Sequence, residues 1–362
     1  MNKRKYIFIA FTVNSSSLAE FFIGLVKKMS QEFNVVIFTD KKPNILIDFN
    51  ENVEILRWPS KRPTNFKDAF FLYRKIKKHK PIMSISMFGS VNVMLLIGWL
   101  TGVPNRIAWI RTLSTQYEQN VWLVKRKKLV YKLSSHIFVN SNATKLDSQS
   151  VYGIPENKIA VLQNSIKKYH RFSGINPNIK SHIAYAGRLH NSKGIDTLLK
   201  AFNKCYATNK DIHLDIIGEG PEKDRLLRLT KKLNIHNSVT FHSNQPKKKV
   251  MEFFENAYMT IVPSIKEAFG YVTIEAMSVK TPVIGSNTSG IKEIIRHQKD
   301  GLLFEPEDVN ELHEKMNILL RDEAYAKKLG EQGYERFINT YEHQKSVNRD
   351  WNVLKKIVED SI

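Results

Sequence analysis

Three features are scarce in this sequence of 362 residues: cysteine, long apolar runs free of polar residues, and closely spaced aspartates. The only cysteine, Cys205, excludes an intrachain disulfide framework and suits a reducing cytoplasm. No Asp-x-Asp occurs, so a metal clamp of that type has no obvious ligands. The apolar run at 6–13 is short and is not followed by a small-residue cleavage site, so we expect no signal peptide.

One charge-free segment, residues 81–105, is long enough to span a bilayer. Serine, asparagine and glycine interrupt it six times, at Ser84, Ser86, Gly89, Ser90, Asn92 and Gly98. We interpret it as a buried strand at 82–88, a Gly-Ser turn and a buried helix at 91–100. A transmembrane helix is the alternative.

The charge is strongly basic and unevenly distributed. The formal net charge is +21, and residues 1–170 hold 27 Lys and Arg against 10 Asp and Glu, a net +17. The remaining residues carry only +4. An excess confined to one half suggests that this half meets an anionic partner, with a lipid surface and nucleic acid as the candidates.

Strand-like and helix-like segments alternate twice along the chain, which is typical of parallel sheets covered by helices on both faces. A stretch rich in Asn, Gly, Pro and Ser at 164–181 separates the two series and indicates a linker. The predicted strands are 6–13, 34–40, 53–56, 82–88, 106–110 and 136–141, then 182–187, 212–218, 239–243, 258–264, 281–286 and 301–305. The predicted helices are 18–30, 66–79, 91–100 and 142–151, with long helical stretches from 310 to about 358.

We therefore predict an α/β protein with two doubly wound, Rossmann-like parallel-sheet domains at 1–165 and 166–340. A C-terminal helix, 341–362, could pack back toward the N-terminal domain. Two such domains in tandem would face each other across a cleft, where the carboxyl ends of the strands bind ligands.

Three segments of the second half predict an anion site at strand ends. Arg188 and Lys193 follow one strand and precede a helix, where cations and free N–H groups attract an anion, although solvated loop cations are the alternative. Gly218-Glu219-Gly220 follows the next strand and resembles only the start of a dinucleotide fingerprint. Glu267 lies in a third loop, and Glu275 falls inside the helix behind it. Two solvated acids on the outside of a helix are the alternative for this pair.

Residues 183–304 resemble the C-terminal half of the retaining glycosyltransferases of family 4, which have the GT-B architecture. The resemblance rests on five segments in the order typical of that family. They are "AGRLHNSKGIDTLLKAF", "IIGEGPEKDRLLRL", "VTFHSN", "VPSIKEAFGYVTIEAMSVKTPVIGSNTSGIKEII" and "GLLFEPED". A looser match, "PIMSISMFGSVNVMLLIGWLTGVPNRIAWI", extends into the first half.

The resemblance implies that the domain at 1–165 binds the acceptor and the domain at 166–340 binds the nucleotide-sugar, and it implies a role for each matching residue. Arg188 and Lys193 would bind the diphosphate of a nucleotide-sugar, and Glu267 would hold its sugar, which makes these three the predicted catalytic residues. Glu275 would accept hydrogen bonds from the ribose. The other predicted donor-binding positions are Ala268, Phe269, Gly270, Tyr271 and Gly218. No cofactor and no metal are expected, because the cations and the helix N-terminus would neutralise the leaving diphosphate.

The first half departs from the family pattern in two places. Asn14-Ser15-Ser16-Ser17 replaces a Gly-Gly turn, and Ser15 and Ser16 are candidates to cap the next helix and to meet a phosphate. Arg111-Thr112 stands where many relatives have a histidine. Arg111 could meet a phosphate or be solvated, and acceptor positioning stays unassigned.

Two helical segments combine cations with aromatic residues, at 66–80 and 121–133. Such helices suit an anionic membrane surface, while packing on the sheet with solvated charges is the alternative. In the second segment, Trp122, Leu123, Leu129 and Tyr131 lie beside four consecutive cations at 125–128. We expect a cytoplasmic protein, peripheral on the inner face of the membrane, with a saccharide or lipid-linked saccharide as acceptor.

The predicted function is thus a retaining, metal-independent glycosyltransferase of bacterial envelope polysaccharide synthesis that uses a UDP-sugar, or less readily a GDP-sugar. Two alternatives keep the fold: an inactive subunit that partners an active enzyme, and a nucleotide-sugar epimerase. Binding of nucleic acid through the basic half is a third, and no RNA-reading module supports it.

Overall fold

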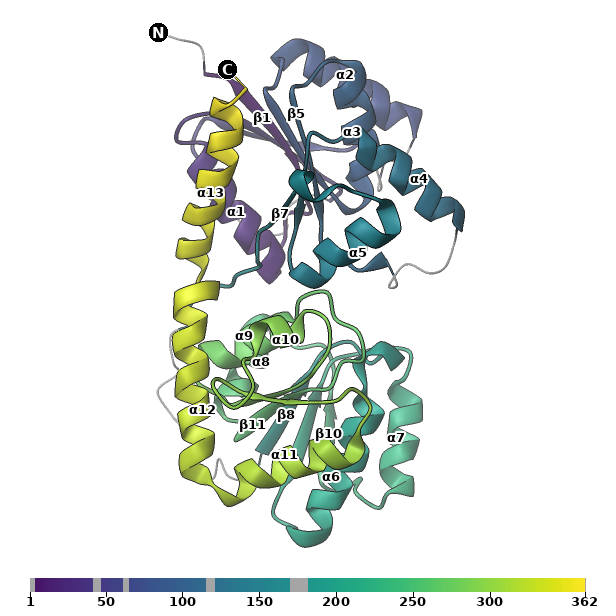
Figure 1. Ribbon diagram of the computed structural model, residues 1–362, viewed down its shortest axis with the longest axis vertical. Coiled ribbons are helices and arrows are strands. Elements are labelled where there is room, and N and C mark those ends of the chain that lie inside the picture. Colours follow the sequence, from purple (N-terminus) through teal and green to yellow (C-terminus); the bar gives the residue numbers. More distant parts are fainter. Residues whose placement is uncertain (1–3, 42–46, 61–64, 115–120, 170–181, 362) are drawn as a thin grey trace. The chain divides into compact units, whose positions relative to one another are not determined.

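The computed structural model describes residues 4–41, 47–60, 65–114, 121–169 and 182–361 (Figure 1). It divides into two units, each of which is considered by itself. Unit 1 consists of Met1–Lys167 and His343–Ile362, and unit 2 consists of Lys168–Glu342.

Unit 1 is built on a seven-stranded parallel sheet in the order β3-β2-β1-β4-β5-β6-β7. The central strand β1 pairs with β2 and β4, so that Ile7 lies opposite both Val35 and Met83. These strands are almost continuously buried, as expected of a parallel sheet with both faces covered. The strands are β1 (Tyr6–Ala10), β2 (Asn34–Thr39), β3 (Val53–Arg57), β4 (Met83–Met87), β5 (Asn105–Ile110), β6 (His136–Val139) and β7 (Ile159–Val161).

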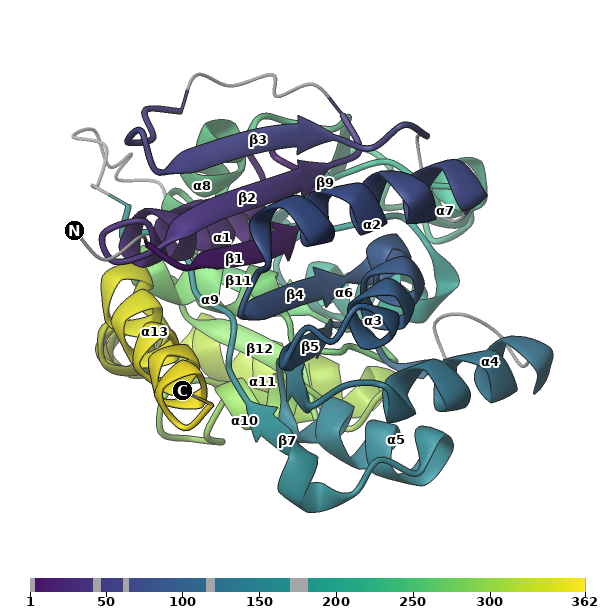
Figure 2. The ribbon, with the colours of Figure 1, turned by 90° about the horizontal axis from the view of Figure 1, so that it is seen from above.

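Helices cover both faces of this sheet (Figures 1 and 2). On one face α1 and α13 pack together around Phe22, Trp109 and Trp351. On the other face α2 and α3 enclose a core that contains Phe38 and Leu72. The helices of unit 1 are α1 (Ser17–Met29), α2 (Phe66–His79), α3 (Val91–Leu100), α4 (Val121–Lys132), α5 (Asn142–Tyr152) and α13 (His343–Glu359).

The charge-free segment 81–105 forms β4 and α3, which confirms the predicted strand and helix. The strand is buried, whereas α3 is buried only in part, since Leu96, Trp99 and Leu100 are exposed. No helix in the described part of the chain combines the length and the apolar character that crossing a bilayer requires. The strand β7 was not predicted, because its apolar run is only three residues long and half-buried.

The predicted linker 164–181 is wrong at its start. Asn164, Ser165 and Ile166 are buried in unit 1, and the carbonyl of Ile166 accepts a hydrogen bond from the N–H of His343 at 3.0 Å. The polar composition of this stretch therefore does not mark exposed chain up to residue 166. Its later part, 170–181, lies outside the described residues.

Unit 2 contains a second parallel sheet, with six strands in the order β10-β9-β8-β11-β12-β13. Helices α6, α7 and α11 pack on one face around Leu198, Leu226 and Leu312. The strands are β8 (His182–Ala186), β9 (His213–Ile217), β10 (Val239–His242), β11 (Met259–Val262), β12 (Val283–Ser286) and β13 (Leu302–Phe304). The helices are α6 (Ile195–Thr208), α7 (Lys223–Lys232), α8 (Lys247–Glu255), α9 (Tyr271–Ser278), α10 (Ile291–Ile294), α11 (Val309–Arg321) and α12 (Glu323–Arg336). Two doubly wound parallel sheets, as predicted, are thus confirmed.

Candidate functional site

Two loops of unit 2 bring two of the predicted catalytic residues into contact. Lys193 ends a short turn between β8 and α6, and Glu267 lies between β11 and α9. The Nζ of Lys193 donates a hydrogen bond to Oε2 of Glu267 at 2.5 Å. Both side chains are mostly buried, with 24% and 18% of their surface exposed. A cation and an acid that lie 74 residues apart in sequence therefore form one pair at the carboxyl ends of neighbouring strands.

The two loops are interlocked by their backbones. The N–H of Ile265 donates to the carbonyl of Ser192 at 2.9 Å. Gly194 has a φ of +62°, and a methyl group there would lie 2.0 Å from the carbonyl oxygen of Pro263. Only glycine fits this conformation and this close approach. The contact between Lys193 and Glu267 is thus held by the main chain on both sides.

A third loop, after β12, supports the same acid, and the sequence reasoning assigned it no role. The hydroxyl of Ser289 accepts a hydrogen bond from the N–H of Glu267 at 3.2 Å, and the N–H of Gly290 donates to the Glu267 carbonyl at 2.9 Å. A methyl group on Gly290 would lie 2.5 Å from Cα of Phe269. The available signal was the Ser-Gly pair just after a predicted strand, inside a segment that already matched the family.

Helix α9 begins next to this pair. Its N-cap is Gly270, which has a φ of +106° and no side chain to cap the first N–H groups. Glu275 lies in the second turn and is half-buried. Ala268 and Phe269 are buried, and the Phe269 ring packs 5.9 Å from the ring of Tyr341. The Phe269 side chain therefore belongs to the core, and its backbone is what could meet a ligand.

Arg188 provides the uncommitted positive charge of the site. It lies two residues after the end of β8 and is exposed, and its guanidinium forms no hydrogen bond or ion pair within the described chain. Its carbonyl accepts a hydrogen bond from the hydroxyl of Tyr185 at 3.3 Å. Burial, and then the nearby charge of Glu267, raise the pKa of Tyr185, so that this hydroxyl stays protonated. Lys193 is already paired with Glu267, whereas Arg188 is available to an anion.

Gly218 packs closely against the backbone at the end of the neighbouring strand. Its φ is +143°, and a methyl group there would lie 2.0 Å from the carbonyl oxygen of Gly187. The glycine is required because the ends of β8 and β9 approach each other closely. Its predicted place in the donor site remains a prediction.

The matching family corresponds to this unit. Residues 166–336 match the family model described as glycosyl transferases group 1. This segment is a group 1 glycosyl transferase domain. This matched segment includes all three interlocked loops and therefore every candidate residue in them.

Curated proteins resemble part of the chain in sequence. It is 27% identical over 218 residues to the capsular polysaccharide biosynthesis glycosyltransferase CapM of Staphylococcus aureus, which covers 59% of this chain and 55% of that protein. The chain spans about half the length of the curated relatives it matches, 52% to 55% for three of them.

Solved structures resemble it over nearly the whole length. Sucrose-phosphate synthase from Thermosynechococcus elongatus has a TM-score of 0.82 at 19% identity and covers 99% of this chain and 100% of its own. Anabaena HepE in complex with UDP has a TM-score of 0.79 at 13% identity, with coverage of 97% and 100%. At these identities the likeness shows the fold, and the predicted GT-B fold is confirmed.

In unit 1, one of the two candidate serines caps a helix. The hydroxyl of Ser16 accepts a hydrogen bond from the N–H of Ala19 at 3.3 Å, which confirms the expected cap on α1. Asn14 holds Ser16 in place, since its side-chain oxygen accepts from both the N–H and the hydroxyl of Ser16. Ser15 and Ser16 are exposed. Their predicted contact with a phosphate stays a prediction.

Arg111 is buried, so the reading as a solvated side chain is wrong. Its guanidinium donates a hydrogen bond to the side-chain oxygen of Asn164 and lies 5.2 Å from the ring centre of Phe22 and 5.6 Å from that of Trp109. Its charge also acts on Asp350 of α13: burial raises the pKa of Asp350 to about 6, against the lowering effect of Arg349 and, to a smaller extent, of Arg111. Arg111 is thus anchored in the fold at the edge of a cavity.

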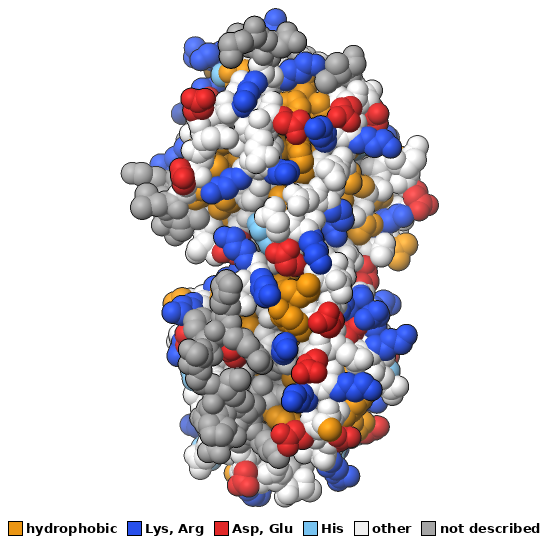
Figure 3. All heavy atoms as spheres, turned by 90° about the vertical axis from the view of Figure 1, so that its left-hand side faces the viewer, with side chains coloured by type: hydrophobic (Ala, Val, Ile, Leu, Met, Phe, Trp, Pro, Cys, Tyr) orange, Lys and Arg blue, Asp and Glu red, His pale blue; other side chains and the backbone are white. Residues whose placement is uncertain are grey.

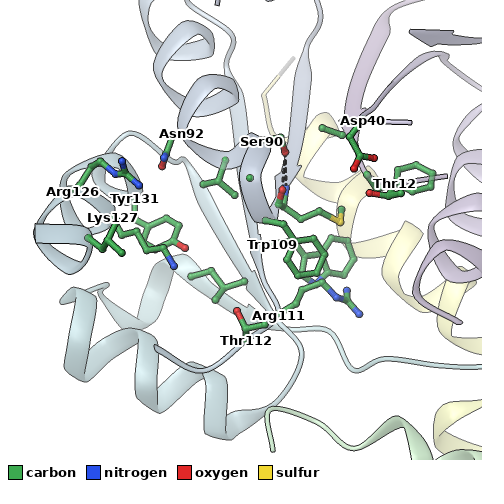
Figure 4. A pocket seen from close by; sticks show the side chains of 18 of the residues that line it. Thr12, Asp40, Ser90, Asn92, Trp109, Arg111, Thr112, Arg126, Lys127 and Tyr131 are labelled. Atoms are coloured by element: carbon green, nitrogen blue, oxygen red, sulfur yellow. Dashed lines mark hydrogen bonds between the residues drawn. The ribbon is translucent and has the colours of Figure 1, made fainter. Parts of the chain in front are cut away.

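That cavity, of about 590 Å³, lies at the carboxyl ends of β1, β2, β4 and β5 (Figure 4). Its polar lining combines hydroxyl groups with three cations and one acid. The polar residues include Thr12, Asp40, Ser90, Asn92, Arg111, Thr112, Arg126, Lys127 and Tyr131. Except for Arg111, none of these was predicted as a site residue.

The prediction for α4 needs a correction. Leu123 and Tyr131, expected on a membrane-facing side, line the cavity, and Tyr131 is buried against Tyr152 with ring centres 5.1 Å apart. Trp122 and Leu129 do lie on the outside and are 80% and 65% exposed. The inner face of the helix thus packs against β5 and β6 and also lines the cavity, while Trp122 and Leu129 remain exposed on the outer face.

Proposed function

We propose that the chain is a retaining glycosyltransferase that moves a sugar from a UDP-sugar to a saccharide acceptor, one linked to a lipid carrier, in bacterial envelope polysaccharide synthesis. The observation that carries this is the Lys193–Glu267 pair beside the N-terminus of α9, within a group 1 domain. The fold neighbour HepE was solved with UDP and with UDP-glucose. The relative CapM is named for capsular polysaccharide biosynthesis. Both support the proposal.

Each part of the site has a role in this reaction. Breaking the bond between the sugar and the diphosphate leaves new negative charge on the diphosphate oxygens. Arg188, Lys193 and the first N–H groups of α9 face that charge, and preorganised donors of this kind usually supply the largest part of catalysis. Glu267 accepts hydrogen bonds from hydroxyls of the transferred sugar, and Glu275 accepts them from the ribose. The backbone from Ala268 to Tyr271 lies between the two acids.

Retention follows from attack on the face that the diphosphate leaves. The acceptor oxygen forms the new bond to the anomeric carbon, the anomeric bond to the diphosphate breaks, and the acceptor proton passes to the diphosphate. No protein nucleophile is required. The sequence has no Asp-x-Asp, so we propose that side-chain cations and α9 bind the diphosphate without a metal.

A panel of nucleotide-sugars tests the donor. We expect UDP and one UDP-sugar to raise the melting temperature, because a ligand present at 100 times its Kd stabilises the folded form by about 2.7 kcal/mol. Slow release of UDP from that sugar without acceptor should follow. No stabilisation by any uridine nucleotide would contradict the choice of donor. Binding without turnover would favour an inactive subunit, and a rearranged nucleotide-sugar would favour an epimerase.

We further propose that unit 1 contacts an anionic membrane on the inner face of the cell through the outer sides of α2, α3 and α4 (Figure 2). Helix α3 contacts both α2 and α4. Apolar side chains are exposed along all three helices, beside cations such as Lys77, whose Nζ lies 5.7 Å from the ring centre of Tyr73. They are Phe66, Phe70, Tyr73, Leu96, Trp99, Leu100, Val121, Trp122 and Leu129.

Apolar side chains next to cations suit an interface that is oily inside and anionic at its surface. The side of unit 1 that includes α13 shows cations interspersed with acids instead of one basic patch (Figure 3). The α2–α4 surface is therefore the better candidate for membrane contact.

Flotation with vesicles that contain an anionic phospholipid tests this surface. We expect wild type to bind at low salt and to dissociate at 1 M salt. The Debye length there is only about 3 Å, so the attraction between the cations and the lipid charges is screened. Replacing both Phe70 and Trp122 by serine should weaken binding more than about 10-fold, since burial of one such ring contributes about 1.5–3 kcal/mol. Leu146→Ser on α5, 65% exposed, is the matched control. Equal binding of all three proteins, or none by wild type, would remove the membrane surface.

A further inference from the structure

The cavity of unit 1 has a cationic end and an acidic end (Figure 4). Arg126, Lys127 and Tyr131 of α4 lie on one side. Asp40, just after β2, and Thr12, after β1, lie on the other. Its volume of about 590 Å³ falls within the roughly 300–1,000 Å³ of typical small-molecule sites. A ligand that fills it would meet charges of opposite sign at its two ends.

The cationic end favours an anion. Arg126 forms no ion pair with any residue in the described ranges. Burial lowers the pKa of Lys127, and the neighbouring charge of Arg126 lowers it further. Asp147 opposes this shift, but its carboxylate already accepts hydrogen bonds from the N–H and hydroxyl of Ser114 at 2.8 and 2.6 Å. An anionic ligand would relieve the repulsion between two adjacent cations.

The acidic end needs a hydrogen-bond donor. Oδ1 of Asp40 is buried and has no hydrogen-bond partner within the part of the chain that the structure describes. A buried carboxylate oxygen without a partner is costly, and a donor from a ligand removes the cost. Between the two ends the wall is apolar and includes Met87, Trp109 and Ile110. Hydroxyl groups on an otherwise carbon-rich ring, as in a sugar, fit this combination.

We propose that this cavity binds the acceptor as a saccharide with an attached anionic group, held by Arg126 and Lys127, while Asp40 accepts a hydrogen bond from a sugar hydroxyl. The inference rests on the proposed function, because it names the acceptor of that reaction. The anionic group is a phosphate of a lipid carrier or a carboxylate of an acidic sugar. Both present charged oxygens that a guanidinium and an ammonium bind.

Calorimetric titration with three probes tests the cavity. The probes are glucose 1-phosphate, glucuronate and neutral methyl glucoside. All titrations use the Arg188→Ala protein as background, so that the unpaired loop cation of unit 2 contributes no phosphate binding. We expect one or both anionic sugars to bind and the neutral sugar to bind at least about 10-fold more weakly. Binding of the phosphate alone indicates a lipid carrier, and binding of glucuronate alone indicates an acidic sugar.

Two double variants remove equal charge from the same helix. Replacing Arg126 and Lys127 by alanine should weaken binding of the anionic sugar about 10- to 100-fold. Replacing Lys125 and Lys128, which are exposed and do not line the cavity, should leave it unchanged. Equal loss in both variants, no loss in the first, or equal affinity for the neutral sugar would overturn the proposal. So would the absence of binding by all three probes.

A variant of the acid separates the two ends. Asp40→Asn should weaken binding of the neutral sugar and of the anionic sugars by the same factor, because it alters the contact with the hydroxyl alone. These titrations are independent of donor turnover. Failure of every UDP-sugar to bind or react would reject the proposed function, while the titrations would still show whether the cavity selects an anionic sugar.

Discussion

Arg188→Ala is expected to lower the rate of UDP release from the donor by about 10²–10³, with little change in melting temperature. The guanidinium is exposed and makes no contact that stabilises the described fold, so its removal leaves unit 2 intact. It is also the only one of the two loop cations that is not already paired, since Lys193 is bonded to Glu267. Most of the loss should appear in kcat, because the charge on the diphosphate is largest in the transition state.

A matched control removes the same charge elsewhere in the unit. Arg228 lies on the exposed side of α7, and Arg228→Ala should retain full turnover. Arg188→Lys should recover only part of the rate, because an ammonium cannot form the two parallel hydrogen bonds of a guanidinium. Steady-state kinetics with the donor from the nucleotide-sugar panel measures all three. Wild-type rates for Arg188→Ala would mean that the diphosphate is bound elsewhere.

Much of the fold could be predicted from local pattern. The bounds of α2 and α3 agree with the predicted helices, because each begins and ends at a clear signal. Asn65 caps α2: its side-chain oxygen accepts a hydrogen bond from the N–H of Asp68, and the Asp68 carboxylate accepts one from the N–H of Asn65. The strand β7 and the packed start of the linker depend on contacts with distant residues, such as the one between Ile166 and His343. The local spacing of apolar residues does not reveal contacts between residues that are far apart in the sequence.

The candidate site residues could likewise be predicted from the sequence only in part. Lys193 and Glu267 could be named from sequence because each follows a recognisable strand and the surrounding segments resemble one family. The cavity of unit 1 could not be found, because four consecutive cations at 125–128 point to different sides of α4. Its sequence predicts a helix but does not show which side faces the sheet edge. Only the structure separates Lys127, which lines the cavity, from Lys125, which faces solvent.

Gly290→Ala is the second change with a large expected effect, because the loop that it disturbs supports Glu267. The added methyl group would lie 2.5 Å from Cα and 2.6 Å from N of Phe269, and these are backbone atoms that cannot rotate away. The segment around Glu267 must then shift. We expect the free energy of unfolding to fall by about 1–3 kcal/mol. Turnover should fall about 10²-fold, as a displacement near 1 Å at a reacting group can cause.

The loss of turnover should exceed what unfolding explains. Far below the melting temperature the variant remains folded, so reduced UDP release there reports the displaced loop and not a smaller folded fraction. Gly98→Ala in α3 is the control, since its methyl group would meet only side-chain atoms at ordinary contact distances, Arg106 at 3.4 Å and Ser84 at 3.6 Å, and alanine favours a helix. That variant should keep wild-type activity and stability. Wild-type turnover in Gly290→Ala would show that the main-chain support of Glu267 is not needed for donor cleavage, and would weaken its assignment as the residue that holds the donor sugar.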